Sequence, residues 1–478
     1  MSPIADISAQ NEASVVPNGK HVEKPSSSFT PLLHRTPWVP PVAVTGEGVH
    51  LILEDGTRII DAVGGAAVNC IGSGHPKVIQ AVKDQLDKLL SNQPSEKLAA
   101  RLISSSDGAF SQCVFVSGGS EAMEAAIKLA KQYFWEVDQP QRKYFIARHQ
   151  SYHGNTLGAL ALSHHPFRRA PYEDILNHKA FHYVSPAYYK RYARAGESEE
   201  QYVARLVQEL EDKFQELGPE NVIGFAAEPV VGATQGVTYA PKGYFAAMSA
   251  VCRKYGALLI LDEVMCGMGR MGTSMHAWQG PNSYTDGVSP DIQAVAKGLG
   301  GGYGSIGAIL LNERVAGGLQ QGSKYLQHGH TYQAHPLAMA ASLAVQDVIE
   351  EENLLEKAGR VGTVLQQQLE QSLTGPNALS APYIFDIRGG GCFWGIEFQF
   401  PEEVEEKWFS KQRFGGLVQA AAMENGAVII GMSGGIDGKK GDFIILAPAY
   451  NISDEEITEV VTKVTKSIED VLKRTVLS

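Results

Sequence analysis

Two apolar segments that each end in a charged residue are the features that most constrain the fold of this 478-residue chain. Residues 257–261 are apolar and lead directly into Asp262, and the largely apolar residues 292–296 lead into Lys297, 35 positions later (297 − 262). Short apolar runs of this kind are typical of strands buried on both faces of a parallel sheet. Because parallel strands end at the same edge of a sheet, we predict that Asp262 and Lys297 face one cleft. The alternative, a surface lysine and a solvated acid, fits poorly with the apolar residues and glycines around them.

Further apolar runs alternate with helical patterns along the chain. Residues 114–116, 144–146, 222–227 and 306–311 are typical of buried strands. Pro76 begins a predicted helix whose apolar positions have helical spacing: Val78, Ile79, Val82, Leu86, Leu89 and Leu90. After about residue 345 we predict a helix at 353–372, a strand at 392–400, a helix near 411–425, strands near 427–431 and 443–447, and a helix at 454–474.

This order of elements predicts an α/β protein with two domains. Residues 76–340 form a large domain around a mostly parallel sheet, and residues 341–478 form a smaller α+β domain. Residues 35–75 carry a hairpin signature around Asp55 and Gly56, and they are predicted to be an N-terminal segment of the small domain. Residues 1–34 are rich in Ser, Pro and Asn and are predicted to be a mobile tail.

Composition narrows the class of partner. The formal net charge is −11, with 44% hydrophobic and 19% charged residues, which indicates a globular chain and disfavours nucleic acid or an anionic membrane as partner. The five cysteines are scattered without a C-x-x-C pair, so we expect reduced thiols. Residues 1–34 hold no arginine and no apolar core of a leader, and no apolar run approaches membrane-spanning length. We therefore expect a cytoplasmic protein.

A glycine-rich turn follows the first predicted strand of the large domain. The turn reads Ser117-Gly118-Gly119-Ser120-Glu121-Ala122, and a helical pattern begins directly after it. Glycines and a hydroxyl at a strand-to-helix turn place main-chain N–H groups at the positive end of a helix, where a phosphate binds well. A tight turn with a serine N-cap is the plainer interpretation of Ser120.

A second group of residues could hold a flat ring. Tyr152 stands beside His153 and Gly154 just past the strand that ends near residue 147, and Val264 follows the acid Asp262. An aromatic ring and an apolar side chain could enclose a planar cofactor from opposite faces. When it is considered alone, a Tyr-His pair is more often explained by ordinary packing and hydrogen bonding.

The lysine, the carboxylate, the phosphate turn and the ring sites together match the needs of one cofactor. Pyridoxal 5′-phosphate needs a lysine that holds its aldehyde as a Schiff base and a carboxylate that keeps its pyridine nitrogen protonated. Lys297 and Asp262 would supply these two groups, and the charge-assisted hydrogen bond from the pyridinium to Asp262 would be strong.

At this point the chain resembles the class III, fold-type I pyridoxal-phosphate aminotransferases, which include the ω-amine, ornithine and 4-aminobutyrate aminotransferases. The resemblance runs from about residue 40 to 470. It rests on residues 117–122, 151–154, Glu228-Pro229-Val230, 261–264 with Gly269-Arg270, Lys297, and His330-Thr331-Tyr332. It implies a fold-type I PLP-transferase fold, with a mostly parallel seven-stranded sheet in the large domain.

The resemblance also implies a role for each matching residue. Lys297 is the Schiff-base lysine and proton shuttle, and Asp262 is the partner of the pyridine nitrogen. Gly119 and Ser120 bind the phosphate, Tyr152 stacks on the ring and Val264 packs beneath it. Thr331 reaches the phosphate of the neighbouring subunit, which implies a homodimer. The implied reaction passes an amino group from an amine donor to a keto acid acceptor, through pyridoxamine phosphate.

Departures from the family pattern concern the substrate. Ornithine- and 4-aminobutyrate-type members carry an arginine where this chain has Asn155. Many ω-aminotransferases have a mobile arginine before the late apolar strand, where residues 430–441 of this chain hold two lysines but no arginine. A lysine does not reproduce the bidentate guanidinium fork. Alignment on Gly72 places Ala67 where several relatives have a tryptophan, so we expect a roomier substrate pocket for a bulky or long-chain amine. Glu228 is a second candidate pocket residue.

Other functions stay open from the sequence. A decarboxylase, aminomutase or racemase would use the same lysine on the same fold, and an inactive scaffold could keep the fold. The Gly302-x-Gly304-x-x-Gly307 pattern fits a dinucleotide fingerprint, but a strand-like run follows it instead of a helix. His328, His330 and His335 lack Cys or carboxylate partners at metal-ligand spacing, so we expect no metal.

Overall fold

The computed structural model describes residues 39–88, 93–272, 274–280, 283–410 and 412–477. By its contacts the chain divides into two compact units, Met1–Val42 and Ala43–Ser478. Of the first unit, residues 39–42 are described, and they form neither helix nor strand. The predicted tail at residues 1–34 and the predicted helical positions Leu89 and Leu90 lie outside the described residues. All elements below belong to the second unit.

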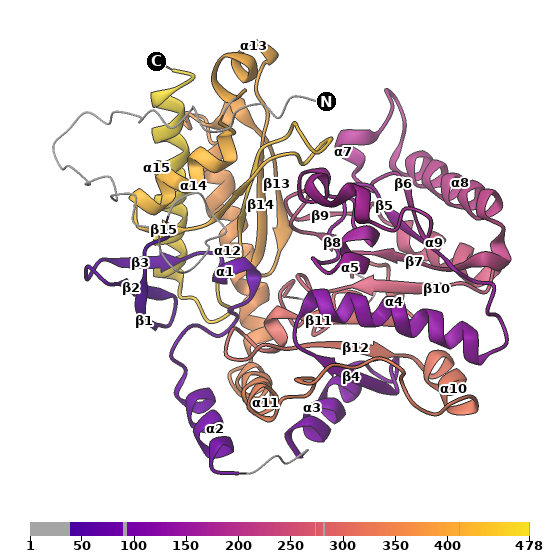
Figure 1. Cartoon of the computed structure of the whole chain (residues 1–478). Coiled ribbons are helices and arrows are strands. Elements are labelled where there is room, and N and C mark those ends of the chain that lie inside the picture. The colour runs from indigo at the N-terminus through magenta and orange to yellow at the C-terminus, as the bar shows by residue number, and fades with distance from the viewer. Residues whose placement is uncertain (1–38, 89–92, 273, 281–282, 411, 478) are drawn as a thin grey trace, which may run out of the picture. The chain divides into compact units, whose positions relative to one another are not determined.

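A seven-stranded sheet is the framework of this unit (Figure 1). Its strand order is β4-β12-β11-β10-β7-β5-β6, and β12 alone runs antiparallel to its two neighbours. The strands are β4 (Gln112–Val116), β5 (Tyr144–Arg148), β6 (Phe181–Val184), β7 (Val222–Ala227), β10 (Leu258–Asp262), β11 (Ile292–Ala296) and β12 (Gly307–Leu311). The predicted fold class, with its mostly parallel seven-stranded sheet, is confirmed.

Helices cover both faces of this sheet. Leu258 and Ile260 of β10 pack in one apolar cluster with residues of α4, whereas Leu259 and Leu261 pack in another cluster with residues of α8 and α9. Burial on both faces explains why the strands are apolar without alternation. The helices of this part are α2 (Pro76–Leu86), α3 (Gln93–Ser104), α4 (Gly119–Glu136), α5 (Leu157–Leu162), α6 (Pro166–Arg169), α7 (Tyr189–Tyr192), α8 (Glu199–Leu217), α9 (Tyr244–Lys254), α10 (Glu313–Gln321) and α11 (Pro336–Glu351).

A second, antiparallel sheet lies in the C-terminal part, in the order β13-β14-β17-β16. It shares an apolar core with helices from the same part of the chain. These strands and helices are β13 (Ile384–Gly390), β14 (Phe393–Phe398), β16 (Ile430–Met432), β17 (Phe443–Leu446), α12 (Leu354–Thr374), α13 (Glu402–Val404), α14 (Phe414–Glu424) and α15 (Asp454–Arg474).

The N-terminal hairpin pairs with the C-terminal part. The strands β1 (Ala43–Glu47), β2 (His50–Leu53) and β3 (Arg58–Asp61) form antiparallel pairs, and β3 pairs in parallel with β15 (Ala427–Val428). The predicted turn between the second and third strands is present, because the Asp55 carboxylate accepts a hydrogen bond from the Thr57 main-chain N–H at 2.9 Å. Two smaller features complete the unit: α1 (Gly64–Ala67), and the strand pair β8 (Val230–Val231) with β9 (Thr238–Tyr239). The predicted domain boundaries stay a prediction.

A buried ionic network joins α7 to the second sheet. The Glu397 carboxylate is only 2% exposed, and it accepts hydrogen bonds from Arg388 Nη1 at 2.6 Å, Arg191 Nε at 2.8 Å and the Tyr188 hydroxyl at 2.6 Å. These donors come from β13 and from the segment at α7. Arg388 also lies 3.3 Å from the Asp386 carboxylate, whereas Glu397 is the carboxylate that pairs with Arg191. Because charges lose hydration when they are buried, both cations depend on this counter-charge.

We expect Glu397→Gln to lower the free energy of unfolding by about 3–5 kcal/mol, since it leaves the Arg191 guanidinium without its counter-charge and Arg388 with Asp386 alone. The matched control is Arg360→Gln, which breaks an ion pair with Asp454 whose side chains are 51% and 56% exposed. The control substitution should lower the free energy of unfolding by less than about 1 kcal/mol. Urea denaturation followed by tryptophan fluorescence measures both, and equal losses would contradict the structural role of Glu397.

Candidate active site

Asp262 and Lys297 come from the carboxyl ends of the neighbouring parallel strands β10 and β11 (Figure 1). In the register of these strands Asp262 lies opposite Ala294, three residues before Lys297. Asp262 is the last residue of β10, and Lys297 begins the short turn directly after β11. The structure therefore places the predicted acid and the predicted amine at one edge of the sheet.

The Asp262 carboxylate is buried, at 4% exposure, and both of its oxygens have partners. Its Oδ2 lies 2.9 Å from Nδ1 of the buried His153, and its Oδ1 accepts the main-chain N–H of Val264 at 3.0 Å. These contacts fix the direction in which the carboxylate points. His153 is a site residue that the sequence analysis treated as an ordinary packing residue. The only sequence signal for it is its place beside Tyr152.

Lys297 is half-buried, and its side chain has no hydrogen bond or ion pair with any residue that the structure describes. Burial lowers the pKa of its amine to about 8, while the negative charges of Asp262 and Glu228 oppose that shift. The residue also adopts a left-handed φ of 45°, a conformation that a lysine rarely adopts. Near neutral pH a larger share of this amine is therefore neutral, and hence nucleophilic, than of an ordinary lysine.

Glu228 shares this electrostatic environment. It is 6% exposed, and its Oε2 has no hydrogen-bond partner among the described residues. Burial raises the pKa of Glu228 well above its ordinary value, and the neighbouring charge of Asp262 raises it further. Burial and the nearby carboxylate therefore favour the protonated form of Glu228. The Glu228 main-chain carbonyl accepts a hydrogen bond from Arg148 Nη2 at 2.5 Å, which anchors the segment.

The glycine turn lies beside these groups. Gly119 begins α4, and a Cβ on Gly119 would lie 2.6 Å from Cγ1 of Val264, so no side chain fits there. The Ser120 hydroxyl accepts a hydrogen bond from the Asn155 N–H at 3.0 Å, and a Cβ on Gly154 would lie 2.9 Å from Cα of Ser120. The structure thus brings Gly119, Ser120 and Val264 together with the segment that carries Tyr152.

Tyr152 is half-buried and contacts two side chains, Arg168 and His165, from the segment that contains α6. The Arg168 guanidinium carbon is 4.6 Å from the centre of the Tyr152 ring, and the His165 ring meets it edge to face at 6.2 Å. The Tyr152 ring therefore packs against an element for which the sequence predicted no role.

Two predicted residues lie apart from this group. Thr331 is exposed in a turn at residues 330–333, and no contact of its side chain with Lys297 or Asp262 is found. The neighbouring His330 Nε2 lies 3.3 Å from the Ser117 hydroxyl, so the turn approaches the start of the glycine turn. Ala67 is 1% exposed, has a left-handed φ of 59°, and packs in an apolar cluster with residues such as Val230 and Cys266.

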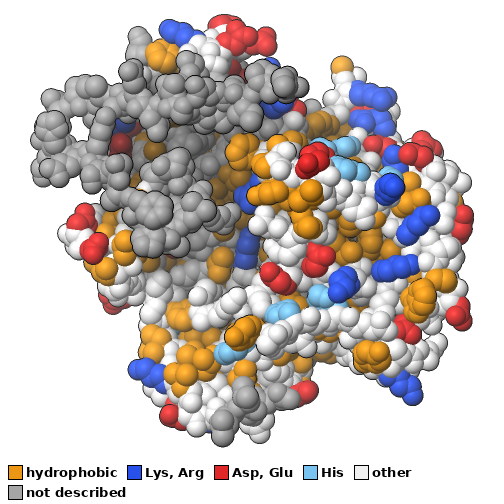
Figure 2. All heavy atoms as spheres, viewed as in Figure 1, with side chains coloured by type: hydrophobic (Ala, Val, Ile, Leu, Met, Phe, Trp, Pro, Cys, Tyr) orange, Lys and Arg blue, Asp and Glu red, His pale blue; other side chains and the backbone are white. Residues whose placement is uncertain are grey.

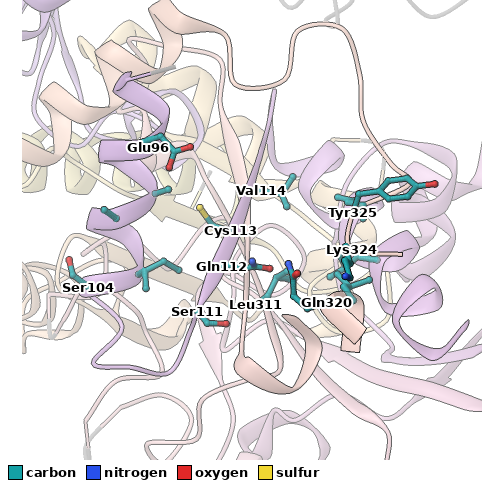
Figure 3. Close-up of a pocket in the computed structure, with 16 residues that line it drawn as sticks. Glu96, Ser104, Ser111, Gln112, Cys113, Val114, Leu311, Gln320, Lys324 and Tyr325 are labelled. Carbon is teal, nitrogen blue, oxygen red and sulfur yellow. The ribbon is translucent and has the colours of Figure 1, made fainter. Parts of the chain in front are cut away.

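Two cavities border the sheet edge at β4. One of about 710 Å³ is lined by Cys113, Leu311 and Tyr325 among others, and by none of the predicted site residues (Figure 3). The other, of about 480 Å³, is lined by Ser117, Tyr332 and His335 and so adjoins the glycine turn. Within the described ranges, no group of three or more His, Cys, Asp or Glu side chains could hold a metal ion.

The fold is that of a fold-type I PLP-transferase, and comparison with known proteins gives the family. The family described as aminotransferase class-III matches residues 35–468, so the chain belongs to the class III aminotransferases. An uncharacterized aminotransferase of Schizosaccharomyces pombe is 43% identical over 436 residues, covering 90% of this chain and 92% of that protein. Gamma aminobutyrate transaminase 3, chloroplastic, of Solanum lycopersicum is 32% identical over 459 residues, covering 93% of this chain and 84% of that protein.

A solved structure supports the same assignment. The omega transaminase from Pseudomonas jessenii in complex with PMP superposes with a TM-score of 0.82 at 30% identity, covering 91% of this chain and 94% of that chain. The chain is thus an aminotransferase, and the decarboxylase, aminomutase and racemase alternatives are not favoured. Membership of this family implies use of pyridoxal phosphate and of small-molecule amine and keto acid substrates.

The lowered pKa of Lys297 can be measured directly in the cofactor-free protein. Only the neutral amine reacts with an acylating reagent, so labelling of Lys297 should rise with pH and reach its half-maximal rate near pH 8. Because Asp262 opposes the shift, Asp262→Asn should move the midpoint to lower pH. Mass spectrometry of the peptide that contains Lys297 gives the rate, and Lys297→Ala removes the signal. A midpoint near the ordinary lysine value of about 10.4 would contradict the described burial.

Proposed function

We propose that this aminotransferase works through pyridoxal 5′-phosphate bound to Lys297, and that it moves an amino group from an amine or amino acid to a keto acid. The observation that carries the proposal is the Lys297 amine, which has no partner among the described residues and lies in the field of Asp262. Asp262 is itself oriented by His153 and by the Val264 N–H. An unpaired buried amine beside an oriented carboxylate has no evident structural purpose, and both groups suit this cofactor.

The residues around the pair fit the shape of the cofactor. Gly119 leaves room between the turn and Val264, and Val264 offers an apolar surface for one face of a ring. The first N–H groups of α4 have no partner within the helix, and Gly119 and Ser120 would present theirs to a phosphate. The Ser120 hydroxyl accepts from the Asn155 N–H, so its own hydrogen is free to be donated to the same phosphate. Tyr152 would stack on the other face of the ring.

Asp262, Lys297 and Glu228 would have different roles in the reaction. When bound, the cofactor supplies an electron sink for the carbon that bears the substrate amine. Asp262, held by His153, keeps a fixed negative charge at the end of β10 and so favours a proton on the group that it contacts. The Lys297 amine, neutral in a large share of molecules near pH 8, can take the proton from the amine-bearing carbon and return it in the reverse half-reaction. Burial favours the protonated form of Glu228, so its charge competes less with that of Asp262.

Reduction tests the proposed covalent link. We expect borohydride treatment of the yellow enzyme to leave a reduced cofactor adduct on the peptide that contains Lys297, as judged by peptide mass spectrometry. Lys297→Ala should show neither the adduct nor transfer of an amino group to pyruvate, whereas Lys324→Ala, a change of a lysine outside the site, should show both. An adduct on another lysine, or none at all, would end the proposal.

We further propose that the enzyme is a homodimer in which Thr331 completes the site of the neighbouring subunit. Thr331 is exposed, and large apolar side chains nearby are exposed too, including Tyr325 at 61%, Tyr332 at 70% and Leu86 at 64%. Figure 2 shows hydrophobic side chains gathered in the lower part of the molecule, where α2 and α11 lie in Figure 1. Exposed apolar surface of this kind marks interfaces between proteins.

Subunit mixing tests the role of Thr331. If Thr331 acts across the interface, Lys297→Ala and Thr331→Ala subunits refolded together should form heterodimers with one intact site. Random mixing should then restore about a quarter of the wild-type activity, because half of the dimers carry one complete site of two. Each variant alone should have less activity, and Lys297→Ala none. Activity of the mixture equal to the average of the separate variants would show that Thr331 acts within its own subunit or not at all.

We also propose that Ala67 leaves space for a bulky or long-chain amine. Ala67 is buried in a cluster that includes the partly buried Met265, which follows Val264 directly. Ala67→Trp should lower the rate with large amines about 10-fold or more and change the rate with small amines little, since overpacking excludes only the larger substrate. Half-reaction kinetics with a series of amines measure this difference. Equal effects on small and large amines would refute it.

Finally, we propose that the protein acts in the cytoplasm. The five cysteines are free, and four of them are buried, which suits a reducing compartment. Among the described residues, no helix is long and apolar enough to cross a membrane. Fluorescence of the full-length chain with a C-terminal tag would test the location, and accumulation in an organelle would refute it.

A further inference from the structure

Arg168 stands at the edge of the candidate site without an anionic partner. It comes from α6, and its guanidinium carbon lies 4.6 Å from the centre of the Tyr152 ring. It is half-buried, and its side chain has no hydrogen bond or ion pair with the residues that the structure describes. Burial lowers the pKa of Lys297 to about 8, and the positive charge of Arg168 is a smaller contribution in the same direction. The two cations therefore share one electrostatic environment.

The other arginines near the site are already engaged. Arg169, the next residue, binds Glu173 at 3.0 Å and the main-chain carbonyl of Ser163 at 2.7 Å. Arg148 donates to the main-chain carbonyl of Glu228, and Arg270 donates to main-chain carbonyls only. Arg168 thus differs from these neighbours, because a planar fork of donors is left for a ligand.

The loop at residues 433–441 packs against the helix that carries Arg168. A Cβ on Gly438 would lie 2.6 Å from Cγ of Pro166, the first residue of α6. This loop contains no arginine. Of its two lysines, Lys440 lies 3.5 Å from the Glu402 carboxylate and Lys439 is exposed. The unpaired guanidinium of Arg168 therefore stands on the element against which this loop packs.

The surroundings of Arg168 also have unused hydrogen-bonding capacity. His165 is 7% exposed, and neither of its ring nitrogens has a partner among the described residues. Burial lowers the pKa of His165 to about 4, and the charge of Arg168 acts in the same direction, so the ring is neutral and offers one N–H. A buried polar group without a partner is costly, so a ligand that accepts its hydrogen bond would be favoured here.

We propose that Arg168 binds the carboxylate of amino acid donors and keto acid acceptors, and so sets the preference of the enzyme for these over simple amines and ketones. This inference rests on the proposed function in one respect: the carboxylate must belong to a substrate that reacts at Lys297. The ligand chemistry itself, one carboxylate against one guanidinium, follows from the unpaired charge and its place above Tyr152. Arg168 is here a substrate-binding residue and takes no part in proton transfer.

Two substrate pairs isolate the carboxylate. L-alanine and isopropylamine differ in a carboxylate replaced by a methyl group, and pyruvate and acetone differ in the same way. In the holoenzyme, Arg168→Gln should lower the half-reaction efficiency with L-alanine and pyruvate about 10- to 100-fold, the range expected for a lost charge-assisted pair. Efficiency with isopropylamine and acetone should stay within about two-fold. Arg168→Lys should fall between, because it keeps the charge but not the fork.

Binding of isobutyrate gives a second readout that needs no reaction. This acid has the same carboxylate but neither an amine nor a keto group, so it can bind but cannot react. Calorimetry should show a dissociation constant about 10- to 100-fold higher in Arg168→Gln than in wild type. The matched control is Lys439→Gln, which removes the exposed lysine of the neighbouring loop and should change neither readout.

Each other outcome overturns the proposal. If Arg168→Gln lowers efficiency equally for both members of each pair, Arg168 only positions Tyr152. If Lys439→Gln reproduces the loss, the carboxylate site belongs to the loop. If wild type prefers neither carboxylate substrate and does not bind isobutyrate, no such site exists. Failure of the proposed function would give a different result. In that case no amine would remove the yellow colour of the enzyme, and borohydride would form no adduct on Lys297.

Discussion

The site depends on one constraint, the burial of an amine beside a carboxylate at the ends of two adjacent parallel strands. The register of β10 and β11 sets Asp262 opposite Ala294, so Lys297 follows within one turn of the chain. In such a place a charged amine loses hydration, and burial lowers the pKa of Lys297 to about 8. The same burial raises the pKa of Glu228. Desolvation thus makes the lysine available as a neutral group, while the His153 contact keeps the carboxylate of Asp262 in place.

This arrangement is tied to the rest of the unit by Arg270. Arg270 is 1% exposed and donates hydrogen bonds to the main-chain carbonyls of Asn69, Cys392, Ala447 and Pro448, while it also faces the Tyr450 ring at 4.7 Å. It lies on the segment that follows Asp262, and its partners belong to the N-terminal segment, the turn before β14 and the residues after β17. One buried cation therefore fixes the ends of three distant segments around the site, and its charge helps to keep the Lys297 amine neutral.

Some strands, helices and site residues could be predicted because short stretches of the sequence have a clear pattern. Asp262 and Lys297 could be found because five consecutive buried positions precede each of them, and such runs have few alternatives to a buried strand. The helix at 454–474 was predicted with the bounds of α15 because its apolar spacing is regular. The helix α8 was overlooked although Ser198 and Gln201 form a capping box before its apolar positions. The strand β6 has only four residues and mixes His and Tyr with apolar side chains, so its pattern was too short.

Other features could not be read from the chain because they depend on contacts between distant residues. The contact between His153 and Asp262 joins positions 109 residues apart, and nothing near His153 in sequence distinguishes it from the other histidines. Arg168 lies in a four-residue helix next to exposed Phe167, where no periodicity marks an inward-facing side. The predicted apolar face of α2 is present, but Ile79 and Leu86 are exposed in the single chain, which the pattern of one sequence cannot foresee.

The unpaired guanidinium of Arg168 would also offset the negative charge that a substrate carboxylate brings into the site. An anionic substrate that entered alone would bring a second negative charge near Asp262, and it would raise the pKa of Lys297 and reduce the share of neutral amine. At a few ångströms and an effective dielectric constant of about 20, one such charge changes the energy by about 4 kcal/mol, which is enough to reverse the effect of burial. A carboxylate that is neutralised by Arg168 adds little net charge. The amine can therefore stay neutral while the acid is bound, so that recognition of the substrate and readiness for proton transfer do not oppose each other.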